Sequence, residues 1–384
     1  MNTDVELLMS FMKSALLGAP APSLTEEEAK SLFRLASRHD LTHIVGSVIG
    51  KNNLLPKGNV RTYYEKAAFS ALYRYQRIAT DLDLLCRIFE EAAIPFMPLK
   101  GSVIRAHYPE PWMRTSCDID VLVHEEHLPA AESLLLAKGF RKDEDGSHDI
   151  SFFSPQGTHI ELHFRLIEDY IAVGIDLPLA DPWAYATPVE VGAYRYMMTD
   201  AMFYYYHIAH MAKHYLHGGC GIRPFIDLYF LSHGYAFDKD ARTALLAMGG
   251  LEAFASAAEK LTAVWLLEDT PDAVCEKMEQ FLLSGGVYGS KENRITVGQV
   301  KRGGKLRYAL SRIFLPYEIL KVQYPVLQKH KWLLPVCEVR RLGKLIFLGG
   351  LRRSKEELRM NQSVSKEAKE ETARHLGELG LSFE

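Results

Sequence analysis

Asp118-Ile-Asp-Val-Leu-Val123 follows Pro98-Leu-Lys-Gly-Ser102 after one short predicted helix and one loop. The apolar and β-branched residues of the first segment predict a strand. Side chains alternate across a strand, so Asp118 and Asp120 project from one face and the apolar residues project from the other. Two carboxylates this close repel each other, and a magnesium ion, which takes oxygen ligands, would offset that repulsion. The pattern therefore indicates either a metal site or a strand edge with solvated charges.

A third acid, Glu161, lies on a later predicted strand and shares one of its faces with His159 and His163. If this strand pairs beside the first, Glu161 joins Asp118 and Asp120. Three acids can hold two magnesium ions roughly 3.5–4 Å apart and clamp both the attacking and the leaving oxygen of a phosphoryl displacement. We expect His163 to be the first candidate for a general base, because it lies on the face of Glu161.

The turn before the acids has the composition of an anion site. Gly101 lets a phosphate approach the backbone N–H groups of a helix N-terminus, and the hydroxyl of Ser102 adds a donor. Ser102 can also cap a short helix that runs through Tyr108. Lys100 and Arg114 are either cations that bind a triphosphate or surface cations.

These segments resemble a known group of enzymes. Gly-Ser, then Asp-x-Asp on a strand, then a lone acid on a later strand is similar to the signature of the polymerase-β-like nucleotidyltransferase superfamily. More narrowly, the chain resembles the uncharacterised nucleotidyltransferase family found in many bacteria, over about residues 70 to 290. The stretches that carry this narrower resemblance are Leu99-Lys-Gly101, Arg114, Asp118-Ile-Asp-Val-Leu-Val123, Ile160-Glu-Leu-His163, His214 and Gly285-Gly-Val-Tyr-Gly289.

The resemblance implies roles for individual residues. In that superfamily three acids coordinate magnesium and the Gly-Ser loop contacts the triphosphate. By match these positions are Asp118, Asp120, Glu161, Gly101 and Ser102. The chain departs from the pattern in having glutamate as the third acid, where aspartate is common, and a cysteine directly before the first acid, where a small residue often stands.

Apolar periodicity and turn residues predict the order of elements around the site. Residues 4 to 90 are predicted to be helical, with an N-cap signal at Ser23-Leu-Thr25, and residues 200 to 284 are predicted to be helical again. Between them we expect a strand at 95–99, a strand at 118–123, a helix at 128–138 closed by Gly139, and strands at 140–142, 149–153 and 158–164.

The predicted fold class is α+β, with a small mixed β-sheet nucleotidyltransferase core flanked by N-terminal and C-terminal helical regions. The predicted division is an N-terminal helical region at 1–90, the core at 91–170, a helical domain at 171–290, and a basic C-terminal helical region with a charged tail at 291–384.

Composition excludes several classes of protein. The 384 residues are 48% hydrophobic and 24% charged, which is ordinary for a folded domain with a sizeable core. The five cysteines are far apart and form no CxxC, which excludes a zinc finger and indicates reduced thiols. The N-terminus lacks the features of a secretory signal, and no apolar run approaches the roughly 18 residues of a spanning helix. We therefore expect a cytoplasmic protein without a transmembrane segment.

Charge is unevenly distributed along the chain. Residues 291–355 contain 16 Lys and Arg against three acids, a balance of +13, so that with a net charge of −3 the rest of the chain carries −16. Such a segment is a solvated face, a contact with an acidic domain, or a surface for an anionic partner such as a polyphosphate, a nucleic acid or an anionic lipid surface.

Two further patterns lie in the second helical region. His207, His210, His214 and His217 recur on one face of a predicted helix, where they bind a metal, reach the acceptor or the phosphates, or line a groove without any ion. Arg223 and Asp227 lie one helical turn apart, and we expect them to pair or cap locally.

The function predicted from the sequence is nucleotidyl transfer. A nucleoside monophosphate would move from a nucleoside triphosphate, with ATP favoured, to a small-molecule acceptor, with two magnesium ions and release of pyrophosphate. Three alternatives remain. One is transfer to RNA or protein through the basic 291–355 segment. The others are a non-catalytic nucleotide-binding module and, with least support, a histidine–metal hydrolase.

Overall fold

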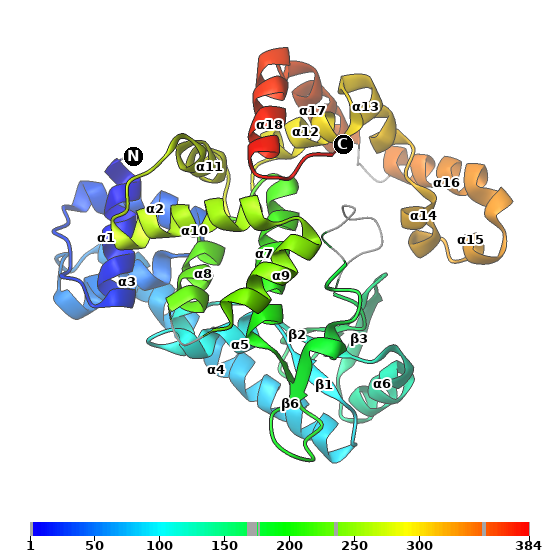
Figure 1. Ribbon diagram of the computed structural model, residues 1–384, viewed down its shortest axis with the longest axis horizontal. Coiled ribbons are helices and arrows are strands. Elements are labelled where there is room, and N and C mark those ends of the chain that lie inside the picture. The colour runs from blue at the N-terminus through cyan, green and yellow to red at the C-terminus, as the bar shows by residue number, and fades with distance from the viewer. Residues whose placement is uncertain (1–2, 167–174, 176, 234–236, 348–350, 384) are drawn as a thin grey trace.

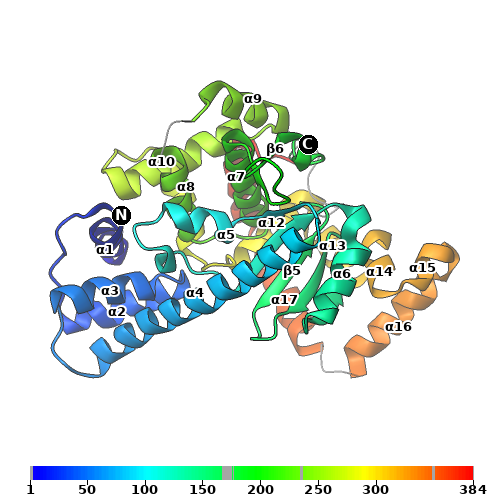
Figure 2. The same cartoon turned by 90° about the horizontal axis from the view of Figure 1, so that it is seen from below.

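The computed structural model of the chain describes residues 3–166, 175, 177–233, 237–347 and 351–383. Helices α1 (Thr3–Leu17), α2 (Glu26–Arg38), α3 (Thr42–Asn52) and α4 (Asn59–Glu91) precede the sheet. Helices α7 (Asp200–Leu216), α8 (Arg223–His233), α9 (Lys239–Gly249), α10 (Glu252–Leu267) and α11 (Ala273–Leu283) follow it. Figures 1 and 2 place α1–α3 at one end of the molecule and the sheet nearer the other.

The sheet has five strands in the order β1-β2-β5-β4-β3. Its members are β1 (Phe96–Pro98), β2 (Asp118–Val123), β3 (Arg141–Asp145), β4 (Asp149–Phe153) and β5 (His159–His163). Strands β2 and β5 are parallel, and the other neighbours are antiparallel. The prediction of an α+β fold, with a small mixed sheet between helical regions, is confirmed.

Alternation along the two central strands separates an apolar face from a polar one. Ile119, Val121 and Ile160 belong to a buried cluster with residues of α4 and of α6 (Leu128–Ala137). Figure 2 shows the long α4 in the foreground, running up to the sheet, with α6 beside the strands. The opposite face carries Asp120 and Glu161, so the helices that cover the apolar face leave the acids on the side of α7.

The helices that precede the sheet in the sequence and the helices that follow it share one hydrophobic core. A single cluster of buried residues includes Leu8 and Phe11 of α1, Tyr205 of α7, Phe254 of α10 and Leu376 of α18 (Lys366–Glu378). The predicted boundaries at 90, 170 and 290 remain predictions, and part of the 167–176 stretch next to one of them lies outside the described residues. A two-stranded hairpin, β6 (Ala186–Pro188) and β7 (Tyr196–Met198), was not predicted.

The C-terminal third is helical, as predicted. It comprises α12 (Lys291–Arg302), α13 (Lys305–Ile313), α14 (Tyr317–Gln323), α15 (Val326–Lys329), the 3₁₀ turn η5 (Lys331–Leu333), α16 (Leu334–Phe347), α17 (Leu351–Ser363) and α18 (Lys366–Glu378). Tyr308 of α13 packs on Gly298 of α12, where an added Cβ would lie 2.4 Å from the tyrosine ring. Among the described residues, no helix combines the length and the apolar character that crossing a membrane requires.

The predicted start of α2 is confirmed. Thr25 caps the helix and forms a capping box with Glu28, because each side chain binds the backbone N–H of the other. The helix ends at His39, whose backbone N–H bonds to Leu35 O. The His39 side chain is fully buried, and neither ring nitrogen has a hydrogen-bond partner among the described residues.

This buried histidine predicts a specific loss of stability in acid. Burial, with a smaller contribution from Arg38, lowers the pKa of His39 from 6.5 to about 4. Above pH 6.5 the ring is neutral in both states, so His39 has no effect on the pH dependence there. Below pH 6.5 the unfolded chain binds a proton that the folded protein excludes, so stability falls until the pH reaches the folded pKa. The loss is about 2 kcal/mol at pH 5.

Urea denaturation at pH 7 and pH 5 measures this effect. The His39→Leu variant should lose about 2 kcal/mol less than the wild type between the two values. The exposed His217 provides a control, since His217→Leu should keep the wild-type dependence. An unchanged pH dependence in His39→Leu would show that His39 already takes up a proton in the folded protein.

Candidate active site

A pocket of about 580 Å³ lies between the polar face of the sheet and α7. Asp118, Asp120, Glu161 and His163 line it from the strands. Helix α7 lines the other side with residues of one face, namely Phe203, Tyr206, His207, His210, Met211, Lys213 and His214. The pocket therefore brings together most of the residues predicted from the two signature segments.

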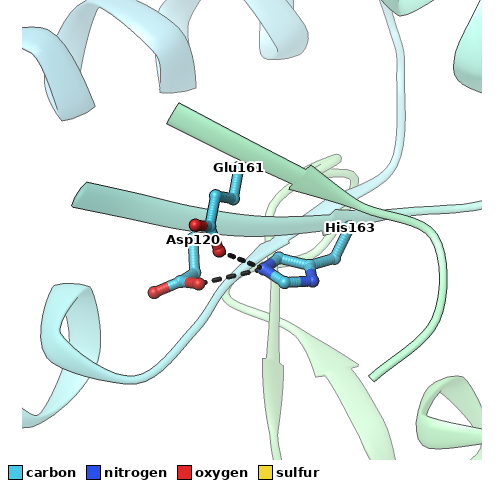
Figure 3. A group of neighbouring side chains, drawn as sticks. All are labelled: Asp120, Glu161 and His163. Carbon is cyan, nitrogen blue, oxygen red and sulfur yellow. Dashed lines mark hydrogen bonds and ion pairs between the residues drawn. The ribbon is translucent and has the colours of Figure 1, made fainter. Parts of the chain in front are cut away.

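Pairing of the two parallel strands creates the acidic centre. Asp120 of β2 lies directly opposite Glu161 of β5, as their register shows. His163 Nε2 lies 2.9 Å from Asp120 Oδ1 and 3.3 Å from Glu161 Oε2 (Figure 3). One ligand atom from each of the three residues lies within 4.8 Å of the others. The strand pairing on which the expected grouping of Glu161 with Asp118 and Asp120 depended is present, and it brings Glu161 and His163 next to Asp120.

Asp118 stands at the start of β2 and lines the same pocket, outside the group of three ligand atoms. Burial raises the pKa of Asp118, and the charges of Asp120 and Glu161 raise it further. Burial and the two neighbouring carboxylates therefore favour proton uptake by Asp118. A divalent cation among the three carboxylates would remove their repulsion.

Lys100 supplies a positive charge at this centre. Its Nζ lies 2.8 Å from Asp120 Oδ1, the oxygen that His163 also contacts. Burial alone would lower the pKa of Lys100, but the Asp120 carboxylate outweighs burial and the pKa is raised. The backbone of Lys100 has φ 45°, which is strained for a residue with a Cβ, so the fold holds this lysine in a costly conformation at the site.

His163 lies with Nε2 between the two carboxylates. Burial favours the neutral imidazole, but hydrogen bonds to Asp120 and Glu161 reverse this preference and raise the pKa of His163. Nε2 is therefore the donor to both carboxylates. The other ring nitrogen, Nδ1, is buried and has no hydrogen-bond partner in the described part of the chain.

The donor set fits a divalent metal ion. Three clustered carboxylates supply the oxygen ligands that magnesium prefers, and an imidazole can ligate manganese or zinc once it is neutral. Burial would raise the pKa of Asp120, but Lys100 and the hydrogen bond with His163 hold it low.

The turn at Gly101 lies against two guanidinium groups. An added Cβ on Gly101 would lie 3.3 Å from Arg114 Nη1 and 3.4 Å from Ser116 Cβ. Arg105 donates from Nε to Gly101 O at 2.6 Å and from Nη2 to Ser116 Oγ at 2.7 Å. Burial and the neighbouring Arg114 lower the pKa of Arg105 to about 10. This excess of positive charge favours an anion beside Gly101.

Ser102 differs from the prediction. The short helix α5 (Gly101–Ile104) has Lys100 in its N-cap position, so Ser102 lies inside the helix and does not cap it. Its hydroxyl is buried, with no hydrogen-bond partner among the described residues, and Ser102 is not among the residues that line the pocket. A buried, unpaired donor next to Gly101 fits a loop that binds an anion, although its hydroxyl does not open into the pocket.

Arg114 is fixed by a partner distant in sequence. Its Nε lies 2.8 Å from Asp227 Oδ1, and Tyr108 donates its hydroxyl proton to the same oxygen at 2.6 Å. Arg223 instead pairs with Asp40 at 3.1 Å. The expected local pair of Arg223 and Asp227 is therefore wrong, because each residue reaches a partner on another element.

The histidines of α7 divide into two groups. His207, His210 and His214 line the pocket, whereas His217 is exposed and bonds to Lys213 O. The Nε2 atoms of His210 and His214 lie 3.1 Å apart, so one ring donates to the other. Burial, Lys100 and His214 lower the pKa of His210. Within the described residues, the group of potential metal ligands is that of the acidic centre, and none of these histidines belongs to it.

Three residues that line the pocket were not predicted to belong to the site, namely Arg74, Tyr206 and Tyr288. Tyr288 belongs to the glycine-rich stretch after α11. The resemblance of that stretch to the family was the one feature of the sequence that could have indicated a role for Tyr288. The other two lie on amphipathic helices, where nothing in the spacing separates a pocket residue from a core residue.

Comparison with known proteins agrees with this geometry. A family model described as uncharacterised nucleotidyltransferase matches residues 25–266, which is more than half of the 384 residues. No curated protein and no solved structure matches the chain. The match includes the turn at Gly101, both strands of the acidic centre and the histidines of α7. The chain belongs to the uncharacterised nucleotidyltransferase family.

Proposed function

We propose that the protein transfers a nucleoside monophosphate from a nucleoside triphosphate to a small-molecule acceptor, with magnesium as the cofactor and ATP as the favoured donor. The observation that carries this proposal is the register that sets Asp120 opposite Glu161, in a pocket that also contains Asp118 and Lys100. Anionic ligands for a metal and cations for a polyphosphate thus lie on one surface.

The chemistry is a displacement at the α-phosphorus. An acceptor oxygen or nitrogen forms a bond to that phosphorus, the bond to the bridging oxygen of the β-phosphate breaks, and pyrophosphate leaves with the electron pair. Magnesium, when bound, would lower the acceptor pKa and neutralise charge that develops on the transferred group. Asp118, Asp120 and Glu161 would hold it.

Residues of the chain would orient the triphosphate and take up the proton. Lys100 and Arg114 line the pocket together with Gly101 and can neutralise phosphate oxygens. His163 would accept a proton only after Nε2 has lost the one it shares with the carboxylates, and metal binding favours that loss.

Thermal unfolding with each of ATP, CTP, GTP and UTP, with and without magnesium, tests the proposal. A ligand at about a hundred times its dissociation constant adds roughly 2.7 kcal/mol to the stability of the folded state. We expect a magnesium-dependent rise in Tm with at least one nucleotide. With that nucleotide labelled at the α-phosphate, transfer of label to a compound from a small-molecule extract identifies the acceptor. No rise with any nucleotide would overturn the proposal, and binding without pyrophosphate release would indicate a non-catalytic module.

Tyr288 is expected to stack on the nucleobase. It is 83% exposed although it lines the pocket, and the other lining aromatics, Phe203 and Tyr206, are buried. Its loop is rigidly placed, since Gly289 at φ 69° contacts the backbone of Gly218 so closely that an added Cβ would lie 2.3 Å from it. An open aromatic face held at a pocket wall suits a planar base.

Tyr288→Ala should therefore weaken nucleotide binding about tenfold, because stacking contributes about 1–3 kcal/mol per base. Titration calorimetry measures the change, and Tyr288→Trp should restore affinity. Inorganic tripolyphosphate, which has no base, should bind the variant as it binds the wild type. Tyr73→Ala, an exposed tyrosine on α4, is the matched control. Equal loss of tripolyphosphate binding would show that Tyr288 supports the loop instead.

A further inference from the structure

An apolar stripe runs along the outer side of α13. Tyr308 anchors the helix from its inner side, where its hydroxyl donates to Glu357 of α17 at 2.7 Å. The opposite side exposes apolar side chains at helical spacing, with Leu306 72% and Phe314 58% exposed. The members of this stripe are Leu306, Leu310, Ile313 and Phe314. Nothing in the described chain covers them, although they would gain free energy by leaving water.

A second stripe runs along η5 and the start of α16. Trp332 is 74% and Val339 70% exposed, with Val336 between them at helical spacing. The inner side of α16 carries Cys337, which packs with Leu320 and Leu327 in a small core of its own. This part of the chain therefore holds its fold with its inner residues and leaves a large aromatic and two valines in solvent.

The end of α13, which carries the first stripe, is hydrogen-bonded to α16, which carries most of the second. Leu315, directly after the first stripe, donates its backbone N–H to Glu338 Oε1 of α16 at 2.7 Å. Arg341 of α16 donates a further hydrogen bond to the carbonyl of Ile313. Figures 1 and 2 both place α14–α16 at the end of the molecule opposite α1–α3, with α13 further in, next to α12. We call the combined surface the α13–α16 patch, made of Leu306, Leu310, Ile313, Phe314, Trp332, Val336 and Val339.

Basic residues lie on the same segment of the chain as this patch. Five exposed basic residues make no ion pair with any acid in the described part of the chain: Arg307, Lys329, Lys331, Arg340 and Lys344. They belong to the 291–355 segment, in which 16 basic residues stand against three acids. The surface thus combines exposed apolar side chains with unneutralised positive charge.

We propose that the α13–α16 patch binds the surface of an anionic lipid bilayer. Amphipathic helices with tryptophan, phenylalanine and leucine on one side and lysine or arginine beside them lie in the interface, where the apolar side chains enter the acyl boundary. Basic residues near an anionic leaflet strengthen this binding about fivefold each. A nucleic acid would neutralise the cations but leave the valines and leucines of the patch in water. A second copy of the chain would bring its own cations against them.

Sedimentation of the full-length protein with lipid vesicles tests the proposal independently of nucleotide binding. We expect binding to phosphatidylcholine vesicles that contain about 30% phosphatidylglycerol, and at least tenfold weaker binding to phosphatidylcholine alone. The double variant Phe314→Glu, Trp332→Glu should lose at least ten times in affinity. Phe69→Glu, which replaces a phenylalanine of α4 that is 72% exposed, is the matched control and should bind as the wild type does.

Two further measurements keep the result interpretable. Brominated lipids should quench wild-type fluorescence more than that of Trp332→Phe, which places this side chain in the bilayer. The triple variant Lys329→Gln, Lys331→Gln, Arg340→Gln should lose the preference for anionic vesicles. Equal binding to both vesicle types would overturn the proposal. So would unchanged binding of the Phe314→Glu, Trp332→Glu variant, or a patch that binds single-stranded RNA or a second copy of the chain and no vesicles.

Discussion

With magnesium present, the Asp120→Asn variant should show none of the nucleotide-induced rise in Tm expected of the wild type, and its turnover should fall at least about a thousandfold. Asp120 is the carboxylate with the most side-chain contacts in the acidic centre, since Lys100 and His163 both bind its Oδ1. Asparagine keeps the size of the side chain but removes the negative charge. It leaves the Lys100 ammonium next to His163 without its carboxylate partner, so a divalent cation would be repelled.

Asp143→Asn is the control, because Asp143 is an exposed acid of the same sheet, on β3, and does not line the pocket. That variant should respond to magnesium and nucleotide as the wild type does. A magnesium-dependent rise of normal size in Asp120→Asn would mean that the metal binds elsewhere, and the assignment of the acidic centre would then be wrong. Circular dichroism confirms that each variant is folded before the comparison is made.

The acidic centre could be predicted because the pattern that defines it lies within a few consecutive residues of one strand. Alternation along a strand puts Asp118 and Asp120 on one face without reference to any other part of the chain. The position of Glu161 relative to them needed one further fact, that β5 pairs with β2 in parallel and in register. From the sequence alone this pairing was only a condition, because the short strands between β2 and β5 in the chain allow more than one strand order in the sheet.

The contacts around the centre could not be predicted, because they join residues far apart in the chain. Lys100 contacts Asp120 from a strained backbone conformation. No residue pattern in the sequence predicts that conformation. Arg223 and Asp227 have the spacing of a local helical pair, yet burial of Asp227 against Arg114 provides a better partner. The spacing of two residues in the sequence shows only which partners their side chains can reach. Packing between distant elements determines which of those partners lies in contact with each side chain.

Asp227→Ala should cost the protein about 3–5 kcal/mol of stability, the effect expected when one member of a buried ion pair is removed. Asp227 is 1% exposed and accepts hydrogen bonds from Arg114 Nε at 2.8 and 2.9 Å and from the Tyr108 hydroxyl. Burial would raise the pKa of Asp227, but Arg114 lowers it, so the pair is ionised in the folded protein. Without the carboxylate, the guanidinium stays buried next to Arg223 with no charge to balance it.

Urea denaturation measures this cost, and a second ion pair supplies the contrast. Asp269 pairs with Lys260 at 2.6 Å in solvent, so Asp269→Ala should leave the urea midpoint close to that of the wild type. The double variant Arg114→Leu, Asp227→Leu removes both charges and should be more stable than Asp227→Ala, because no buried charge is left unpaired. It should still bind nucleotide poorly, since Arg114 is proposed to contact the triphosphate. If Asp227→Ala lost no more stability than Asp269→Ala, water would have to reach Arg114 in the folded protein, and the pair would not hold the arginine in place.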